Sequence, residues 1–184
     1  MIVVGVAGHR VLADIERVRS GVDSAIRRVQ ARYPGDEIRV MSALAEGADR
    51  LITESILAQT DSRLTAVLPL PPADYMKDFA SAESRNEFER LIERADELIV
   101  MDPAPTRDKA YEAAAGYVLD NSDLLIAIWD GNEAQGRGGT GQTVARARHL
   151  GLPIAVVHAG NRKPGSMVAT TLGERQGGVL FENL

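Results

Sequence analysis

Short runs of β-branched and aliphatic residues alternate along this chain with longer amphipathic stretches, and this alternation strongly limits the folds available to it. Six of these runs are expected to form strands, at positions 2–7, 38–42, 64–68, 97–101, 124–129 and 154–158. Strands separated by helical stretches are typical of βαβ units, in which helices cover both faces of a parallel sheet. The sequence therefore predicts an α/β fold with a doubly wound, mostly parallel sheet.

Helical spacing of apolar residues is clearest between the first two predicted strands. Val18, Val22, Ile26 and Val29 recur on one face there, and Pro34-Gly35 ends the helix. No repeat or linker divides the 184 residues, so we expect a single domain with a core over about 1–158 and a looser segment at 159–184. Further helices are expected at 46–57, 84–95, 108–121 and 140–150, and 179–181 is a candidate edge strand.

Composition argues against several classes of protein. Cysteine is absent, which excludes disulfides and thiolate chemistry, and the three histidines lack ligand spacing, so neither a metal site nor a cofactor is expected. A net charge of −5 with scattered basic residues argues against nucleic acid as a partner. No apolar run approaches the roughly 20 residues that span a bilayer, and the first residues read poorly as a signal peptide. We therefore expect a cytoplasmic protein without membrane contact.

The densest glycine clusters follow predicted strands directly. They lie at positions 5–10, 42–49 and 129–142, whereas the turns at 34–35 and 151–153, on the opposite edge, are short connections. Open parallel sheets bind their ligands at the carboxyl ends of the strands. The asymmetry therefore predicts which edge of the sheet carries a ligand site.

The glycine-rich segment before the last predicted helix is the strongest candidate for a phosphate-binding turn. Without Cβ atoms, a backbone can approach a phosphate closely and adopt positive φ values that turn successive N–H groups toward one anion. A helix that begins at Thr140 adds free N–H groups and the positive end of its dipole. The alternative is a flexible surface loop whose threonine caps the helix. The residues concerned are Gly138, Gly139, Thr140, Gly141 and Gln142.

Gly8, His9 and Arg10 follow the first predicted strand. An imidazole there can donate a hydrogen bond to a ligand, and a guanidinium can hold a phosphate through two N–H groups. Structural alternatives exist for all three residues. Gly8 can serve close helix–sheet packing, His9 can cap the loop, and Arg10 can form a salt bridge with a nearby acid.

Two carboxylates at the same edge are candidate ribose-binding or catalytic groups. Glu46 opens the second predicted helix together with Asp49, and helix capping alone accounts for both equally well. Asp130 ends an apolar strand, so it needs either a backbone N–H of its loop or a ligand hydroxyl as a partner. Trp129, the sole tryptophan, either stacks on a base or packs in the core, and the same alternatives apply to Tyr111.

Two common nucleotide-binding motifs are missing. The first glycine loop reads G-x-x-G and lacks the third glycine of G-x-G-x-x-G, and the second strand ends at Ser42 without a carboxylate placed for a ribose diol. This disfavours an ordinary NAD-dependent dehydrogenase. The chain also lacks G-x-x-x-x-G-K-[ST], which argues against a P-loop nucleotide hydrolase.

Five segments together resemble bacterial members of the SLOG superfamily, a group of Rossmann-like proteins that includes the "Lonely guy" phosphoribohydrolases and DNA-processing protein A. They are residues 8–10, 44–50, 68–71, 122–131 and 138–140, and the resemblance covers about positions 3–158. In that superfamily the glycine-rich turn binds the phosphate of a nucleotide or nucleotide derivative. Since related proteins are commonly dimers, the resemblance also implies a homodimer. It implies phosphate binding by Gly138, Gly139 and Thr140, in a cleft lined by Gly8, Glu46, Gly47 and Asp130. Gly131, which follows Asp130, is a further candidate ligand-binding residue.

One departure from this pattern bears on function. Relatives of the phosphoribohydrolase type carry P-G-G-x-G-T-x-x-E, whose glutamate assists cleavage of the N-glycosidic bond. Here Gln142 or Thr143 stands in its place, and neither can act as a general acid or base near neutral pH. The leading hypothesis is therefore a module that binds or senses a nucleotide-derived ligand such as a mononucleotide, NAD or an ADP-ribose derivative. The rival is an N-glycosidase acting on nucleoside 5′-monophosphates, with Glu46 or Asp130 as the replacement acid, and a third possibility is a scaffold without a ligand.

Overall fold

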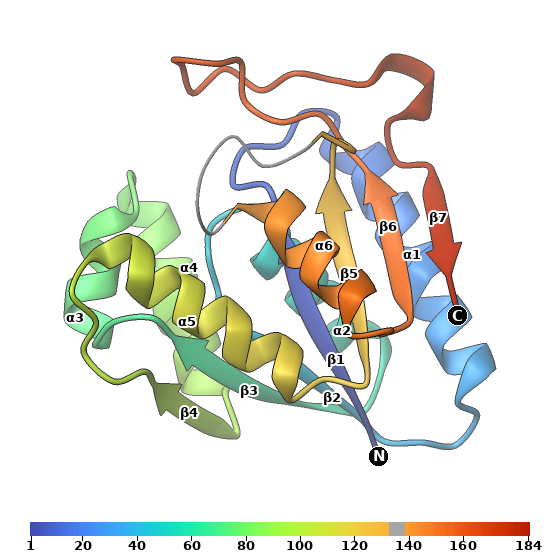
Figure 1. Cartoon of the computed structure of the whole chain (residues 1–184), viewed down its shortest axis with the longest axis horizontal. Coiled ribbons are helices and arrows are strands. Elements are labelled where there is room, and N and C mark those ends of the chain that lie inside the picture. Colours follow the sequence, from blue (N-terminus) through green and yellow to red (C-terminus); the bar gives the residue numbers. More distant parts are fainter. Residues whose placement is uncertain (133–138) are drawn as a thin grey trace.

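The computed structural model describes residues 1–132 and 139–184. Within these ranges seven strands form one sheet in the order β4-β3-β2-β1-β5-β6-β7 (Figure 1). The first six are parallel, and β7 pairs antiparallel with β6 at one edge. All six predicted strands and the candidate edge strand are confirmed. The strands are β1 (Ile2–Gly8), β2 (Ile38–Ser42), β3 (Ser62–Leu68), β4 (Glu97–Val100), β5 (Leu124–Trp129), β6 (Ile154–His158) and β7 (Val179–Glu182).

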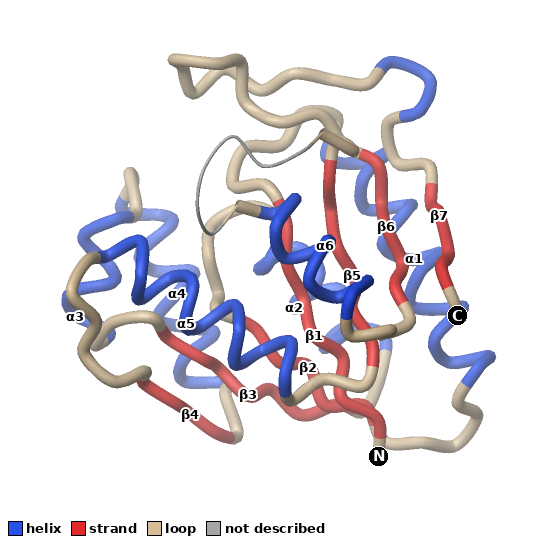
Figure 2. The backbone as a smooth tube through the Cα atoms, viewed as in Figure 1, coloured by secondary structure: helices blue, strands red, loops and turns tan. Residues whose placement is uncertain are grey.

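Helices cover both faces of this sheet, as Figure 2 shows. On one face lie α1 (Ile15–Arg32), α2 (Ala48–Gln59) and α4 (Ala82–Arg94), and on the other lie α5 (Arg107–Asp120) and α6 (Thr140–His149). The doubly wound, Rossmann-like α/β fold predicted from the sequence is therefore confirmed. Three short helical segments complete the chain: α3 (Pro72–Tyr75) and the 3₁₀ turns η1 (Met76–Asp78) and η2 (Gly173–Arg175).

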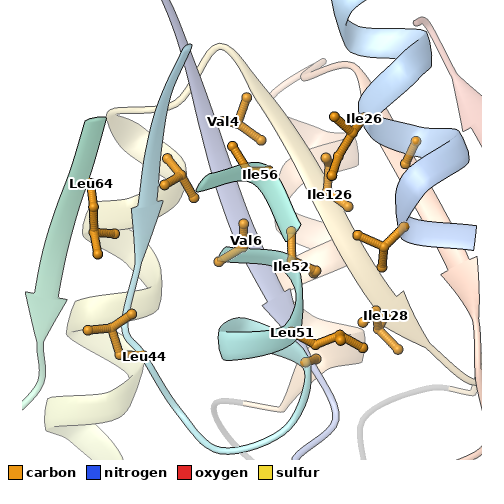
Figure 3. Close-up of a cluster of buried hydrophobic side chains, with 14 of the residues drawn as sticks. Val4, Val6, Ile26, Leu44, Leu51, Ile52, Ile56, Leu64, Ile126 and Ile128 are labelled. Carbon is orange, nitrogen blue, oxygen red and sulfur yellow. The ribbon is translucent and has the colours of Figure 1, made fainter. Parts of the chain in front are cut away.

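The main core lies between the central strands and helices α1 and α2 (Figure 3). Val4 and Val6 of β1 and Ile126 of β5 face this side, and they meet Ile52 and Ile56 of α2 there. The other residues of β5 point to the opposite face of the sheet. Leu125, Ala127 and Trp129 alternate with Ile126 along the strand and pack under α6. Because both faces of β5 are buried, its sequence is a continuous apolar run instead of an alternating one.

Two helix starts differ by two residues from the predicted ones. The helix expected from position 46 begins at Ala48, because Gly47 has φ 79° and ψ −114°, a non-helical conformation. The helix expected from position 84 begins at Ala82, because the Ser81 hydroxyl accepts a hydrogen bond from the backbone N–H of Ser84 at 3.1 Å and caps the helix. The short segments α3 and η1 were not predicted, since neither is long enough to display a hydrophobic period.

The C-terminal segment is held by one buried side chain, Gln176, which is 3% exposed. Its amide oxygen accepts hydrogen bonds from the N–H groups of Gly160 (2.9 Å) and Leu172 (3.1 Å), and its amide nitrogen donates to the Ala13 carbonyl at 2.8 Å. This amide therefore ties the segment after β6 to the loop between β1 and α1. Among the described residues no helix combines the length and the apolar composition needed to cross a membrane.

Candidate functional site

The carboxyl ends of β1 and β5 lie side by side in the middle of the sheet, with Gly8 opposite Ile128. The chain leaves β1 for α1 on one face and leaves β5 for α6 on the other face (Figure 1). The helices that follow these two neighbouring strands therefore lie on opposite faces of the sheet, and open α/β sheets form their ligand crevices at such a point. Residues 8–10 and the start of α6 lie together at this switch point, with the Thr140 hydroxyl 3.5 Å from the His9 ring.

His9 links the two loops at this point. Its ring is buried, its Nε2 accepts a hydrogen bond from the Asp130 backbone N–H at 3.0 Å, and its Nδ1 lies 3.5 Å from the Thr140 hydroxyl. Burial lowers the pKa of His9, and the Asp130 carboxylate, whose Oδ1 is 3.3 Å from Nε2, only partly opposes this effect. An Nε2 that accepts carries no proton, so the proton of the neutral ring is on Nδ1, facing Thr140. This arrangement matches the loop-capping alternative for His9.

The residues that end β5 are engaged within the protein. The Asp130 carboxylate accepts a hydrogen bond from the Asn132 backbone N–H at 3.0 Å, so its partner includes a backbone N–H of its own loop. Gly131, with φ 84°, makes the turn. Trp129 is 8% exposed, packs under α6 and donates from Nε1 to the Asn132 carbonyl at 2.9 Å. These contacts favour core packing for Trp129 over stacking on a base.

Gly8 and Gly47 allow two backbones to pack closely beneath the site. A Cβ atom on Gly8 would lie 2.4 Å from Cβ of Ala48, and one on Gly47 would lie 2.4 Å from the Arg10 carbonyl oxygen. The Ala48 N–H also donates to the His9 carbonyl at 3.0 Å. The start of α2 therefore supports the loop after β1 directly, and Gly8 has the packing role that was the structural alternative for it.

Helix α6 begins at Thr140, as predicted, with Gly139 as its N-cap residue. The N–H groups of Gln142 and Thr143 donate to the Gly139 carbonyl at 3.0 and 3.2 Å, which closes the first turn. One expectation is corrected: Gly139 has φ −81° and ψ 163°, an extended conformation open to any residue, and not a positive φ. Gly141 and the exposed Gln142 lie in the first turn of the helix. Gly138 lies outside the described residues.

A cavity of about 110 Å³ opens beside these loops. At roughly 30 Å³ per water molecule it has room for about four waters, the size of a sugar ring or a phosphate and well below that of a whole nucleotide. Its small apolar lining comes from glycine, alanine and valine residues, and its polar lining comes from Arg10, Asp49, Tyr75, Tyr111, Thr140 and Thr143. Residues far apart in the sequence thus converge on one small space.

Asp49 is the buried carboxyl group of this cavity, with 6% of its surface exposed. Burial raises its pKa from 3.8 to about 7, against the opposing effects of a hydrogen bond from the Ala45 N–H (3.4 Å) and of the nearby positive charges of Arg10 and Arg50. A carboxyl group that titrates near neutral pH in a pocket is a frequent property of functional sites. Sequence reasoning had treated Asp49 only as a helix-start residue.

Arg10 and Tyr111 form another wall of the cavity. The Arg10 guanidinium lies over the Tyr111 ring, 5.0 Å from its centroid. The Tyr111 hydroxyl donates to the Asp78 carboxylate, which also pairs with Arg107 at 2.9 Å. Burial raises the pKa of Tyr111, so its hydroxyl stays protonated at neutral pH. These contacts hold the exposed Arg10 side chain at the cavity by stacking.

Glu46 is not brought to the cavity. Its carboxylate accepts hydrogen bonds from the Ser84 hydroxyl and, at 3.4 Å, from the Ala80 N–H, both near the start of α4. Arg50, 2% exposed, lies in the same cluster and donates to the Ser84 carbonyl at 2.7 Å. Glu46 therefore joins the loop before α2 to α4. The carboxylate that lines the cavity is that of Asp49.

The opposite edge of the sheet carries a larger hollow of about 700 Å³, lined by the turns near residues 33–38 and 59–63. Its charged groups pair with one another: the Met1 amino group contacts Asp36 at 2.7 Å, and Arg63 contacts Glu37 at 2.6 Å. These groups are also exposed to water. We therefore assign the site to the smaller cavity, where the buried Tyr75 hydroxyl has no hydrogen-bond partner among the described residues.

Sequence reasoning missed Asp49, Tyr75 and Thr143 as site residues, and it left Tyr111 undecided. Asp49 does carry a local signal, because it lies at positions i−3 and i−7 from Ile52 and Ile56 and so on the apolar face of its helix. Tyr75 has no such signal in the sequence, because its four-residue helix is too short to display a hydrophobic period. In the described part of the chain, no group of three or more His, Asp or Glu side chains is arranged to hold a metal ion.

Comparison with known proteins adds no assignment. No family model matches the chain, and no curated protein matches it either.

Proposed function

We propose that this chain binds a phosphate-bearing nucleotide or nucleotide-derived ligand of the mononucleotide, NAD or ADP-ribose type at the β1/β5 switch point. The observation that carries the proposal is that the start of α6 and Arg10 border the same cavity as the buried Tyr75 hydroxyl, which has no hydrogen-bond partner among the described residues. Protein cavities with a few convergent polar groups and a perturbed carboxyl are typical of small-molecule sites.

The phosphate group belongs at the start of α6 in this proposal. The helix N-terminus carries the positive end of the helix dipole, and N–H groups of its first turn are oriented toward an anion placed there. Thr140 lies at the cavity wall and adds a hydroxyl donor. Arg10 borders the same space and adds a positive charge with several donors.

Substitution of Gly139 by valine tests this placement. The extended φ of Gly139 accommodates valine without backbone strain, so we expect the variant to fold normally. The branched side chain would obstruct the approach of an anion to the first turn of α6. We expect binding of adenosine 5′-monophosphate, NAD and ADP-ribose, measured by calorimetry or thermal shift, to be lost in this variant, and unchanged affinity would mean that the turn is only structural.

Arg10→Ala provides a second test with a matched control. A charge-assisted hydrogen bond contributes about 1.5–3 kcal/mol, so we expect a loss of roughly 10- to 100-fold in affinity for phosphorylated ligands. Arg63→Ala removes an exposed arginine at the opposite edge of the sheet and should leave affinity unchanged. Equal effects of both substitutions would indicate nonspecific electrostatics instead of a site.

The rival function, an N-glycosidase, draws support from Asp49. A general acid works best when its pKa lies near the working pH, and the pKa of Asp49 is raised to about 7. The carboxylates of Glu46 and Asp130, the acids first considered, accept hydrogen bonds from the Ser84 hydroxyl and from the Asn132 backbone N–H, respectively. Asp49 is therefore the acid on which the rival function depends.

We expect incubation with adenosine 5′-monophosphate to release no adenine above background. Gln142 or Thr143 stands where the resembling hydrolases carry an acid, and neither can supply the proton transfer that contributes about 10² to 10⁴ in rate. Chromatography of the products checks this, and the nucleotide should be recovered intact. Base release that disappears in Asp49→Asn while binding persists would establish the rival.

A further inference from the structure

The cavity at the switch point contains two polar groups that the fold leaves without adequate partners. The Tyr75 side chain is fully buried and lines the cavity, and among the described residues its hydroxyl has no hydrogen-bond partner. Asp49 accepts one long hydrogen bond, from the Ala45 N–H at 3.4 Å, although a carboxylate has about four acceptor positions. Buried polar groups are nearly always paired, so a ligand or water is expected to complete these two.

Tyr75 is held in place by its surroundings. Its ring packs against Phe79, Phe88 and Tyr111, with centroid distances of 4.9, 5.6 and 5.9 Å. This packing needs only the aromatic ring, so a phenylalanine would fit equally well. The hydroxyl is therefore not explained by the core around it.

The charges around the cavity indicate what kind of group fits beside Asp49. Arg10 and Arg50 are the cations that act on Asp49, and the hydroxyls of Tyr75 and Tyr111 are neutral because burial raises the pKa of each phenol. Asp49 disfavours a second anion, and the two arginines disfavour a ligand cation. A neutral hydroxyl suits both protonation states of Asp49, because it donates to the carboxylate and accepts from the protonated acid.

We propose that this cavity is a subsite for the hydroxyl-bearing sugar of the ligand, recognised by the Asp49 carboxyl and the Tyr75 hydroxyl, next to the phosphate site at the start of α6. Its volume of about 110 Å³ suits one sugar ring. A sugar with two adjacent hydroxyls can form a hydrogen bond to the Asp49 carboxyl with one hydroxyl and to the Tyr75 hydroxyl with the other. This proposal rests on the proposed function, and it names the sugar as the part of the ligand that the cavity recognises.

The test uses base-free probes, so that the unknown base does not affect the result. The three probes are methyl ribofuranoside 5-phosphate, its 2,3-dideoxy analogue and orthophosphate, and calorimetry measures their affinities for the full chain. We expect the hydroxylated sugar phosphate to bind the unaltered protein at least about tenfold more tightly than the dideoxy analogue. Asp49→Asn and Tyr75→Phe should each remove most of this preference, and neither should weaken the binding of orthophosphate.

Thr53→Val is the matched control for Tyr75→Phe. The Thr53 hydroxyl is also buried without a hydrogen-bond partner among the described residues, but it does not line the cavity. The control should therefore retain the full preference for the hydroxylated sugar. Tyr75→Phe removes a hydroxyl that has no hydrogen-bond partner in the described part of the chain, so it keeps the test valid even if the Asp49 variant does not fold.

Different failures have different meanings. If orthophosphate binds but the hydroxylated and dideoxy sugars bind equally well, the phosphate site stands and the sugar subsite is overturned. The same conclusion follows if the Asp49 and Tyr75 variants leave the preference intact, because waters alone then fill the cavity. If none of the three probes binds, the proposed function fails and the subsite falls with it.

Discussion

Asp49→Asn is expected to be more stable than the unaltered protein at pH 8, and most of this gain should vanish at pH 5. Burial raises the pKa of Asp49 from 3.8 to about 7. Between these values the folded state holds a proton that the unfolded state has released, so stability falls as the pH rises and reaches its full loss above pH 7. At about 1.4 kcal/mol for each pH unit between the two values, the loss is on the order of 4 kcal/mol.

An asparagine at position 49 keeps the shape and carries no charge at any pH, so it removes this loss. It also removes a carboxylate from the first turn of α2, which costs up to about 2 kcal/mol at a buried position. The first effect is larger, and the net result is stabilisation at alkaline pH. The same substitution should weaken ligand binding, because the Asp49 carboxyl is the group that we propose binds a sugar hydroxyl of the ligand.

Urea unfolding at pH 5 and pH 8 measures this effect. Asp61→Asn makes the same chemical change at an exposed position and should alter stability little at either pH. An Asp49 variant that shows the same change in stability between pH 5 and pH 8 as the unaltered protein would show that Asp49 is not the group that titrates there.

Gly47→Ala is expected to destabilise the fold by about 3 kcal/mol or more, because it combines backbone strain with a steric clash. Gly47 has φ 79° and ψ −114°, and its Cβ would lie 2.4 Å from the Arg10 carbonyl oxygen. The loop after β1 would have to move away from α2. At roughly 2–4 °C per kcal/mol for a domain of this size, the thermal midpoint should fall by about 6–12 °C.

Gly35→Ala separates the two causes. Gly35 has φ 80°, almost the same as Gly47, but nothing lies within 4 Å of the Cβ position. It should therefore show the cost of a positive φ without a clash, at about 1 kcal/mol. Gly47→Ala should also weaken binding of phosphorylated ligands, because Arg10 and His9 shift, whereas Gly35→Ala should leave it intact. Equal losses of stability in the two variants would show that the close approach at Gly47 is unimportant.

Local pattern was sufficient to predict most secondary structure from the sequence. All six parallel strands appear at their predicted positions, and α6 begins at Thr140 as expected, because hydrophobic period and glycine placement act over a few residues. The same reasoning predicted the doubly wound sheet, since strands alternate with helices along the chain. It failed at the short α3 and η1 segments, where no period can develop.

The tertiary structure alone decided which side chains meet. Glu46 and Asp49 are three residues apart in the sequence, yet Glu46 contacts Ser84 of α4 and Asp49 lines the cavity. The turn at Gly47, just before α2, separates them, and α2 packs its Asp49 face toward the cavity. Tyr75 belongs to a third element, α3, and lines the same cavity. Its ring is held there by packing against Phe79 and Phe88. Such contacts depend on the relative placement of distant segments, and a local sequence pattern contains no information about that placement.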